Sequence, residues 1–374
     1  MNRQIQSALT ALGLDDHGGE WLRRVESANA GDIERALAEP PGSYRLDRLA
    51  ALVSPAAKRR LEDMAAAARK LTVRRFGKTV RLYAPLYLSN YCVNSCVYCG
   101  FNRDTDAPRA RLTPKEAAAE ADVLAAAGFR DILLVSSEDR EFITVDYLRE
   151  LAGRLSGRFS SISVEIYQMA AEEYEALFAA GIDGVTIYQE TYDRALYGRC
   201  HPAGPKSDYD NRLDAPGRIG SAGMREIGIG VLLGLGDWRI ETLALAEHAY
   251  WLIKRYWKSH VSISFPRLRP AEGVDGSSFR QIPDAELVQM IAALRLCFSD
   301  VGLVLSTREP AVLRDRLIEL GITKVSAASR TSPGAYTGRC GEAVRQFEVE
   351  DTRTASEVAA VIRSHGYDPV WKDW

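Results

Sequence analysis

The sequence predicts an α/β protein, a TIM-type (β/α)8 barrel with a helical N-terminal extension. Eight short apolar or β-branched runs follow one another after residue 79, and amphipathic helical stretches separate them. Strands that alternate with helices pair in parallel through right-handed crossovers, and eight is the number that closes a barrel. The length of 374 residues also suits an α/β barrel that forms one domain. A doubly wound open sheet is the alternative, because the sequence does not show closure.

The elements follow in a simple order along the chain. Residues 1–75 are rich in Ala, Leu and Arg and are expected to form the helical extension, with a Pro-Pro-Gly break at residues 40–42. The barrel core is expected over residues 76–335, and residues 336–374 are expected to pack on it as a C-terminal segment. The expected strands cover residues 80–89, 131–137, 161–167, 183–189, 226–234, 260–266, 301–306 and 323–328.

The helical stretches between these strands carry recognisable end signals. The stretch TPKEAAAEADVLAAAG begins at Thr113, a residue type that caps helix N-termini, and ends at Gly128. The stretch DAELVQMIAALRLCFSD begins on Asp284, which is also a capping type. These signals support helices that alternate with the strands.

Composition excludes several functions. The chain is 46% hydrophobic and 26% charged with a net charge of −2, and this balance argues against binding to nucleic acid or to a membrane surface. The N-terminal stretch lacks the apolar core of a signal peptide, and no apolar run approaches the ~20 residues that span a bilayer. Cys200, Cys297 and Cys340 are scattered, so no disulfide framework is expected. A cytoplasmic protein is therefore predicted.

Polar residues follow nearly every expected strand. Functional groups of an α/β barrel gather at the C-terminal ends of its strands, so these residues should line one mouth and suit a polar small molecule. They are Cys92, Cys96 and Cys99; Ser136, Ser137 and Glu138; Gln189 and Glu190; Arg267 and Arg269; Ser306, Arg308 and Glu309; and the serine-rich stretch SAASRTSPG.

The three cysteines after the first strand predict a metal centre. Cys92, Cys96 and Cys99 lie within eight positions, and thiolates are soft ligands for zinc or iron–sulfur clusters. A structural zinc site needs four protein ligands, and only the distant Cys200 or His201 would supply a fourth. A zinc-binding structural module is the weaker alternative. An iron–sulfur cube on three cysteines leaves one iron open for a substrate or cofactor, so the sequence predicts such a cluster.

The CxxxCxxC pattern, with Tyr98 before its last cysteine, resembles the radical S-adenosylmethionine (SAM) superfamily. In that superfamily the open iron chelates the amino and carboxylate groups of SAM, and reduction yields methionine and a 5′-deoxyadenosyl radical. The cofactor carries the hard chemistry and the protein directs it. The resemblance implies a [4Fe–4S] cluster and SAM as cofactors, Cys92, Cys96 and Cys99 as metal ligands, and Tyr98 at the cofactor site.

Further segments resemble the tyrosine lyases of thiamin thiazole biosynthesis. They are PLYLSNYCVNSCVYCGF, YQETY, HPAGPKSDYDNRLDA, PRLRPA, STREP, GITKVSAAS and PVWKDW, from about residue 80 to the C-terminus. That family cleaves the Cα–Cβ bond of L-tyrosine to 2-iminoacetate (dehydroglycine) and p-cresol. The related hydrogenase-maturation tyrosine lyases add a second cysteine-rich cluster site, whereas this chain has only Cys340 after residue 297.

The resemblance also assigns residues to the SAM site. Ser136, Ser137 and Glu138 stand where many relatives carry a Gly-Gly-Glu strand that binds the SAM amino group, and the two serines depart from that pattern. Glu190 matches the position that binds the ribose hydroxyls. Arg212 matches the arginine that pairs with the SAM carboxylate, a task that suits a guanidinium fork. A solvated surface position is the alternative for each charged residue.

Ser306 and Arg308 are the expected catalytic residues, because they resemble the Ser-x-Arg element that grips the substrate carboxylate in aromatic amino-acid lyases. Pairing of Arg308 with Glu309 or with a neighbouring helix is the alternative. His201 and Lys206 are expected to shape the site. The implied partners are L-tyrosine, a flavodoxin- or ferredoxin-type electron donor and thiazole synthase. The rival substrate is another aromatic amino acid such as tryptophan, because ring recognition leaves no clear signature.

Overall fold

A computed structural model describes residues 4–339, 341 and 343–372. All eight expected strands are present, and each lies at or close to the expected residues. Their ends differ from the expected ones by a few residues, as is usual where a strand runs into a loop. The strands are β1 (Thr79–Ser89), β2 (Asp131–Ser136), β3 (Ser161–Glu165), β4 (Gly184–Glu190), β5 (Glu226–Val231), β6 (His260–Ser264), β7 (Gly302–Leu305) and β8 (Lys324–Ser326).

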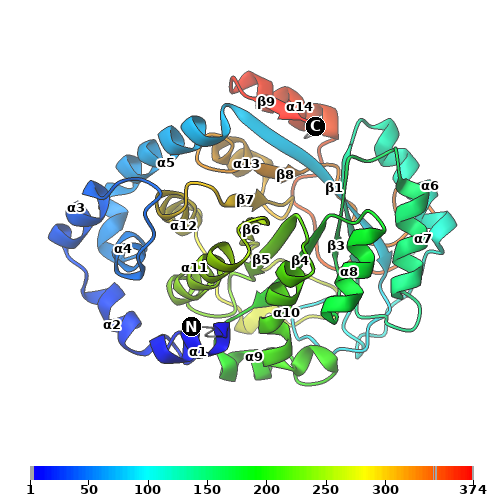
Figure 1. Cartoon of the computed structure of the whole chain (residues 1–374), viewed down its shortest axis with the longest axis horizontal. Coiled ribbons are helices and arrows are strands. Elements are labelled where there is room, and N and C mark those ends of the chain that lie inside the picture. Colours follow the sequence, from blue (N-terminus) through cyan, green and yellow to red (C-terminus); the bar gives the residue numbers. More distant parts are fainter. Residues whose placement is uncertain (1–3, 340, 342, 373–374) are drawn as a thin grey trace.

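The sheet closes into a barrel. Neighbouring strands pair in parallel in the order β2-β3-β4-β5-β6-β7-β8-β1, and β1 also pairs with β2. Leu86 of β1 lies opposite Leu134 of β2, and Leu82 of β1 lies opposite Val325 of β8. The predicted (β/α)8 barrel is therefore confirmed, and the open doubly wound alternative is wrong. A short strand, β9 (Asp368–Val370), adds to the first residues of β1 outside the ring (Figure 1).

Helices surround the barrel (Figure 1). Thr113 caps the first of them through a reciprocal capping box with Glu116, as its residue type predicts. Asp284, in contrast, is the first helical residue after Pro283, so the predicted cap is wrong by one position. The helices are α6 (Pro114–Ala126), α7 (Val145–Leu155), α8 (Ala171–Ala179), α9 (Arg194–Cys200), α10 (Tyr209–Ser221), α11 (Trp238–Arg255), α12 (Asp284–Cys297), α13 (Ala311–Leu317) and α14 (Ala355–Ser364).

The N-terminal residues form helices that pack on the barrel. Arg48 ties them together, because its buried guanidinium donates to the carbonyls of Ala36, Glu39, Pro40 and Ser43. These helices lie against α11 and α12. They are α1 (Ile5–Leu12), α2 (Gly19–Ser27), α3 (Ala30–Ala38), α4 (Leu46–Leu52), the 3-10 turn η1 (Pro55–Arg60) and α5 (Leu61–Phe76). The division into units at residues 75 and 335 stays a prediction.

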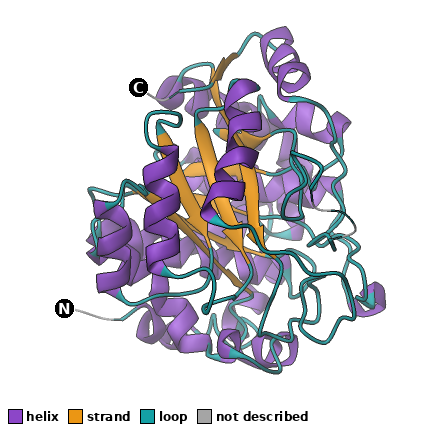
Figure 2. Ribbon diagram, turned by 90° about the vertical axis from the view of Figure 1, so that its right-hand side faces the viewer, coloured by secondary structure: helices purple, strands orange, loops and turns teal. Residues whose placement is uncertain are grey.

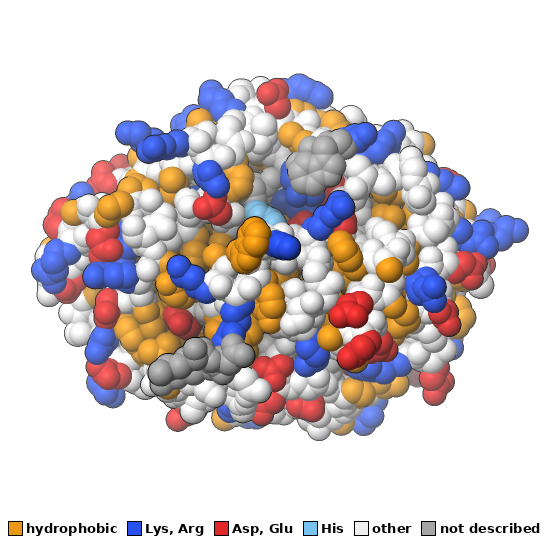
Figure 3. Space-filling model, viewed as in Figure 1, with side chains coloured by type: hydrophobic (Ala, Val, Ile, Leu, Met, Phe, Trp, Pro, Cys, Tyr) orange, Lys and Arg blue, Asp and Glu red, His pale blue; other side chains and the backbone are white. Residues whose placement is uncertain are grey.

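The two ends of the barrel differ. Figure 2 shows long loops gathered on the side away from both chain ends. These segments follow the C-terminal ends of strands, at residues 90–113, 191–208, 265–283 and 327–354, and the second of them includes the short helix α9. Figure 3 shows the opposite face, with a hollow near its centre. A cavity of about 410 Å³ lies at this N-terminal end, and charged residues such as Glu226 and Lys324 line it. Within the described residues, no helix is both long and apolar enough to cross a bilayer.

Candidate active site

The loop after β1 carries the three cysteines, and Arg109 holds its shape. The Arg109 guanidinium donates to the carbonyls of Asn90 at 2.7 Å and Phe101 at 2.9 Å, and also to two others further along. The Asn90 side chain accepts the Ala110 N–H at 2.7 Å. A loop without helix or sheet hydrogen bonds needs such side-chain partners for its backbone. Asn90 Nδ2 also donates to the Val344 carbonyl at 3.3 Å, which joins this segment to the loop after β8.

Cys92, Cys96 and Cys99 line one pocket at the mouth of the barrel. Burial raises the pKa of the Cys96 thiol to about 12 and that of Cys99 to about 11, because a thiolate loses hydration there. Within the described residues, no three His, Cys, Asp or Glu side chains converge closely enough to hold a single metal ion. Three thiols spread around one pocket fit a cluster of several irons, whose cysteines bind different atoms.

Glu190 projects into the same pocket from the end of β4. A register shift between Tyr188 and Glu190 breaks the regular pairing of β4 with β5, and Glu190 has a φ of 69°, in the left-handed region. Its carboxylate accepts a hydrogen bond from Lys206 Nζ at 2.6 Å. Burial alone would raise the pKa of Glu190, but Lys206 and Arg212 outweigh it and hold that pKa below its ordinary value. An ionised carboxylate therefore faces the pocket.

Arg212 reaches this pocket from α10. It is buried, and its guanidinium donates to the Tyr188 carbonyl at 2.9 Å and to Gln168 Oε1 at 3.2 Å. A planar guanidinium has further donors that these two contacts leave for a ligand. The structure thus excludes the surface position that was the alternative for Arg212.

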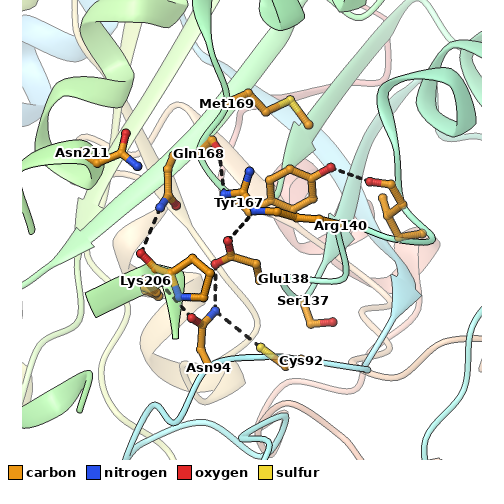
Figure 4. Close-up of polar contacts among 12 residues, drawn as sticks. Cys92, Asn94, Ser137, Glu138, Arg140, Tyr167, Gln168, Met169, Lys206 and Asn211 are labelled. Carbon is orange, nitrogen blue, oxygen red and sulfur yellow. Dashed lines mark hydrogen bonds and ion pairs between the residues drawn. The ribbon is translucent and has the colours of Figure 1, made fainter. Parts of the chain in front are cut away.

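Glu138 is also buried and lies in a network that Figure 4 shows. Its carboxylate accepts hydrogen bonds from Asn94 Nδ2 and Arg140 Nε, both at 2.8 Å. Asn94 lies 3.7 Å from Cys92 Sγ and accepts the Lys206 N–H at 2.9 Å. Glu138 therefore fixes the loop of the cysteines to the end of β2. Its carboxylate is engaged by the protein, not by solvent.

The two serines beside Glu138 face in different directions. Ser136 Oγ donates to the Ser137 carbonyl at 3.0 Å, and Ser137 Oγ donates to the Tyr91 carbonyl. Both serines line the pocket of the cysteines. The Ser137 backbone is engaged as well, because its N–H donates to the Ser89 carbonyl at 3.2 Å and its carbonyl accepts the Asp139 N–H at 3.0 Å.

Tyr98 is buried and lines the same pocket as the three cysteines. Its hydroxyl lies 2.7 Å from His201 Nε2, and His201 Nδ1 lies 2.9 Å from the Tyr197 carbonyl. Burial lowers the pKa of His201 to about 3, so the imidazole is neutral. His201 and Lys206 both support the pocket wall, which agrees with the shaping role expected of them.

A second pocket adjoins the first and holds Ser306 and Arg308. Ser306 Oγ accepts the Arg308 backbone N–H at 3.4 Å, and the Arg308 guanidinium lies over the Phe347 ring at 3.3 Å. Glu309 does not pair with Arg308. It accepts instead from Arg267 at 2.9 Å, and it also pairs with Arg269 at 3.2 Å. Arg308 is thus left to face the pocket, and its pairing with Glu309, one of the two alternatives, is wrong.

Sequence reasoning missed several residues of the two pockets. Glu165 at the end of β3 lines both, as do Gln346 and Phe347 from the loop after β8. The position of Glu165 at a strand end was a usable signal, since the same rule selected Glu190. Gln346 and Phe347 carried no such signal, because a long irregular loop brings them over the mouth.

A closed parallel barrel with three cysteines on the loop after its first strand defines the radical SAM class of enzymes. Residues 86–246 match the model of the Radical SAM superfamily, and residues 264–368 match the Biotin and Thiamin Synthesis associated domain. A [4Fe–4S] cluster and SAM are the cofactors of this class, as the sequence predicts. The residues present fit these cofactors. One pocket contains the three thiols, the ionised carboxylate of Glu190 and the Arg212 guanidinium, which has donors left for a ligand.

The 2-iminoacetate synthases of Escherichia coli (strain K12) and Salmonella typhimurium (strain LT2) are each 43% identical to the chain over 353 residues. The matches cover 94% of this chain and 92% of each relative. The chain therefore belongs to the 2-iminoacetate synthase family. The predicted family is confirmed, and it replaces the zinc-binding alternative.

Two solved structures share the whole architecture. A crystal structure of HydG, a maturase of the [FeFe]-hydrogenase, is 31% identical with a TM-score of 0.89, and the match covers 96% of this chain and 81% of that chain. HydG from Carboxydothermus hydrogenoformans is 33% identical with a TM-score of 0.89, covering 99% and 86%. The sequence sets this chain apart from such maturases because Cys340 is its only cysteine after residue 297. Cys340 lies outside the described residues.

Proposed function

We propose that this protein is a radical SAM lyase that cleaves the Cα–Cβ bond of L-tyrosine to 2-iminoacetate and p-cresol. The observation that carries the proposal is the pair of adjoining pockets at the barrel mouth. One holds the three cysteines with Glu190 and Arg212, and the other holds Ser306 and Arg308. Two relatives that are 43% identical bear the name 2-iminoacetate synthase.

The cofactor pocket would be used as follows. Cys92, Cys96 and Cys99 hold the [4Fe–4S] cluster through their thiolates. Once reduced, the bound cluster and SAM supply the removal of one hydrogen atom from the substrate. Glu190 accepts hydrogen bonds from the SAM ribose, and Arg212 pairs with the SAM carboxylate. Tyr98, Ser136, Ser137 and Glu138 complete the wall of this pocket and exclude water from it.

The substrate pocket would fix the direction of attack. Arg308 and Ser306 hold the carboxylate of tyrosine, so that its amino group points toward the cofactor pocket. Radical formation at nitrogen then weakens the Cα–Cβ bond, and the departing benzylic fragment is favoured because its para oxygen delocalises the spin. Overall, two electrons and one proton convert tyrosine and SAM into p-cresol, 2-iminoacetate, methionine and 5′-deoxyadenosine.

The reaction implies partners. The electrons require a one-electron donor of the flavodoxin or ferredoxin type. Iminoacetate is readily hydrolysed to glyoxylate, and a thiazole synthase is the proposed consumer of the C–N unit. A cytoplasmic location also stays a proposal.

The test is anaerobic incubation of the reconstituted protein with SAM, reductant and each aromatic amino acid in turn. Tyrosine should give p-cresol, glyoxylate and 5′-deoxyadenosine, and Arg308→Ala should lose most of this turnover. Arg149→Ala, a change on the exposed face of α7, is the matched control. If tryptophan gives an indole product and tyrosine gives no p-cresol, the substrate is tryptophan and the proposed tyrosine reaction is wrong.

A further inference from the structure

Two opposite charges face each other across the barrel mouth. Glu165 ends β3, and Arg308 follows β7. In the closed ring β3 and β7 are four strands apart in either direction, so the two side chains come from opposite walls. Both line the cofactor pocket and the substrate pocket, and therefore stand where the two meet. Among the described residues they form no ion pair with each other.

Glu165 differs from the other acids of these pockets. Glu138 pairs with Arg140, Glu190 with Lys206, and Glu309 with Arg267 and Arg269. Among the described residues, no cation lies within salt-bridge distance of Glu165. A carboxylate that is partly buried and has no cation beside it is costly to keep, and such groups gather where a ligand supplies the missing partner.

The surroundings of Glu165 also shift its pKa. Burial, and then the negative charge of Glu190, raises the pKa of Glu165 to about 7, although Arg308 and a hydrogen bond from Tyr188 oppose the shift. Arg308 is affected in the same way, since burial lowers its pKa. Each group thus lacks a partner of opposite charge, and each faces the same small space.

An α-amino acid carries the two charges that this space lacks. Its carboxylate matches Arg308, and its ammonium matches Glu165, with one carbon atom between the two groups. We infer that Glu165 binds the α-amino group of the substrate and, with Arg308, selects a zwitterionic α-amino acid irrespective of its ring. This inference rests on the proposed function, which it deepens by assigning the amino end. It also places the nitrogen beside the cofactor pocket, because Glu165 lines that pocket too.

The experiment compares three ligands on the anaerobic holoenzyme loaded with SAM and left unreduced. They are L-tyrosine, 3-(4-hydroxyphenyl)propionate, which lacks the amino group, and tyramine, which lacks the carboxylate. Their affinities are measured by calorimetry for the wild type, Glu165→Gln and the control Glu172→Gln, which removes a charge from the exposed start of α8. Iron content and SAM affinity are measured on every sample.

In Glu165→Gln the affinity for tyrosine should fall on the order of 10- to 100-fold, as for a lost charge-assisted hydrogen bond. The affinity for the propionate should stay or improve, since it has no ammonium to place. Glu172→Gln should match the wild type. Arg308→Ala should show the opposite selectivity: the affinities for tyrosine and the propionate should fall, and the affinity for tyramine should not. Glu165→Gln should keep iron and SAM.

Several results would overturn the inference. Unchanged tyrosine affinity in Glu165→Gln, or equal losses for tyrosine and the propionate, would show that Glu165 does not contact the amino group. Loss of iron or SAM would assign Glu165 a structural role instead. A wild type that binds tryptophan and not tyrosine would contradict the proposed substrate only. The affinities of wild type and Glu165→Gln for tryptophan and for indole-3-propionate, which lacks the amino group, would then decide the role of Glu165.

Discussion

At the level of single residues, the described cysteines differ in their surroundings. Cys92, Cys96 and Cys99 share a pocket, whereas Cys297 is fully buried among apolar side chains of the core. A thiol in apolar surroundings behaves as a small apolar group. We therefore expect position, and not residue type, to decide which thiols bind iron.

Cys96→Ala should lose the cluster, because removing one of three protein thiolates leaves two irons poorly held. Cys297→Ala, a cysteine of similar burial outside the pocket, should keep it and lose only some stability. Iron and acid-labile sulfide, measured after anaerobic reconstitution, give the answer. Full iron content in Cys96→Ala would disprove the assignment.

Glu190→Ala and Arg212→Ala should each weaken SAM binding and leave the iron content unchanged. Each removes a charge-assisted hydrogen bond, so the affinity should fall by about 1.5–3 kcal/mol. Calorimetry with SAM on the reconstituted proteins is the measurement, and Arg149→Ala serves again as the control. SAM affinities equal to wild type in both variants would return these two residues to a purely structural role.

At the level of elements, α11 reaches back to the turn after β4 through Glu241. This buried carboxylate accepts hydrogen bonds from the Thr191 hydroxyl and, at 2.8 Å, from the Tyr192 N–H. Burial raises the pKa of Glu241 from its ordinary value of 4.5 to about 7. The turn that leads from Glu190 into α9 thus depends on a group that changes charge near neutral pH.

Stability should therefore fall as pH rises through this range. Between about pH 4.5 and pH 7 the folded protein keeps a proton on Glu241 that the unfolded chain has released, so deprotonation favours unfolding. Glu241→Gln mimics the protonated acid, since its oxygen can accept from Tyr192 and its amide can donate to Thr191. Its advantage over wild type should grow with pH to about 1–3 kcal/mol.

Urea unfolding of both proteins at pH values from about 5 to about 8 measures that difference. The pKa of Glu165 lies in the same range. The test therefore uses the difference in unfolding free energy between Glu241→Gln and wild type at each pH, and not the slope of either protein alone. A difference that is constant across this range would show that Glu241 stays ionised in the folded protein.

The elements that the sequence predicts well are those with a local signal. Eight β-branched runs and the capping Thr113 depend on near neighbours, and the structure agrees with them. Glu190 and Arg308 were found because strand ends collect functional groups. Arg109, Gln346 and the freedom of Arg308 from Glu309 could not be found in this way. Each depends on contacts between segments that only the closed barrel brings together.

At the scale of the whole molecule, the N-terminal helices and the barrel meet at Gln289 of α12. This fully buried amide donates to the carbonyls of Leu52 at 2.9 Å and Ser54 at 2.8 Å. Gln289→Leu should remove both bonds, but the Ser54 carbonyl keeps the Ala57 N–H at 3.2 Å, so the protein should be destabilised by about 1–3 kcal/mol. Gln281→Leu, an exposed change of the same type, should stay close to wild type.

The midpoint of urea unfolding, followed by circular dichroism, checks this expectation. Loss of the N-terminal helices before the barrel in Gln289→Leu would locate the weakness at this contact. A midpoint equal to that of Gln281→Leu would mean that the two carbonyls find other partners, and that the interface does not rely on Gln289.

The closure of the ring also sets an order of events during folding. Residues 81–83 of β1 meet residues 324–326 of β8, and the loop after β8 then covers the cysteine loop, with the Gly100 N–H bound to the Gln346 carbonyl at 3.1 Å. Contacts between segments so distant along the chain form late, because their loop must close before they repay its entropy. A nascent chain therefore exposes the three thiols proposed to bind iron before the loop after β8 can cover them. The cluster must be delivered to a nearly finished barrel, or the exposed thiols must be guarded against oxidation until synthesis ends.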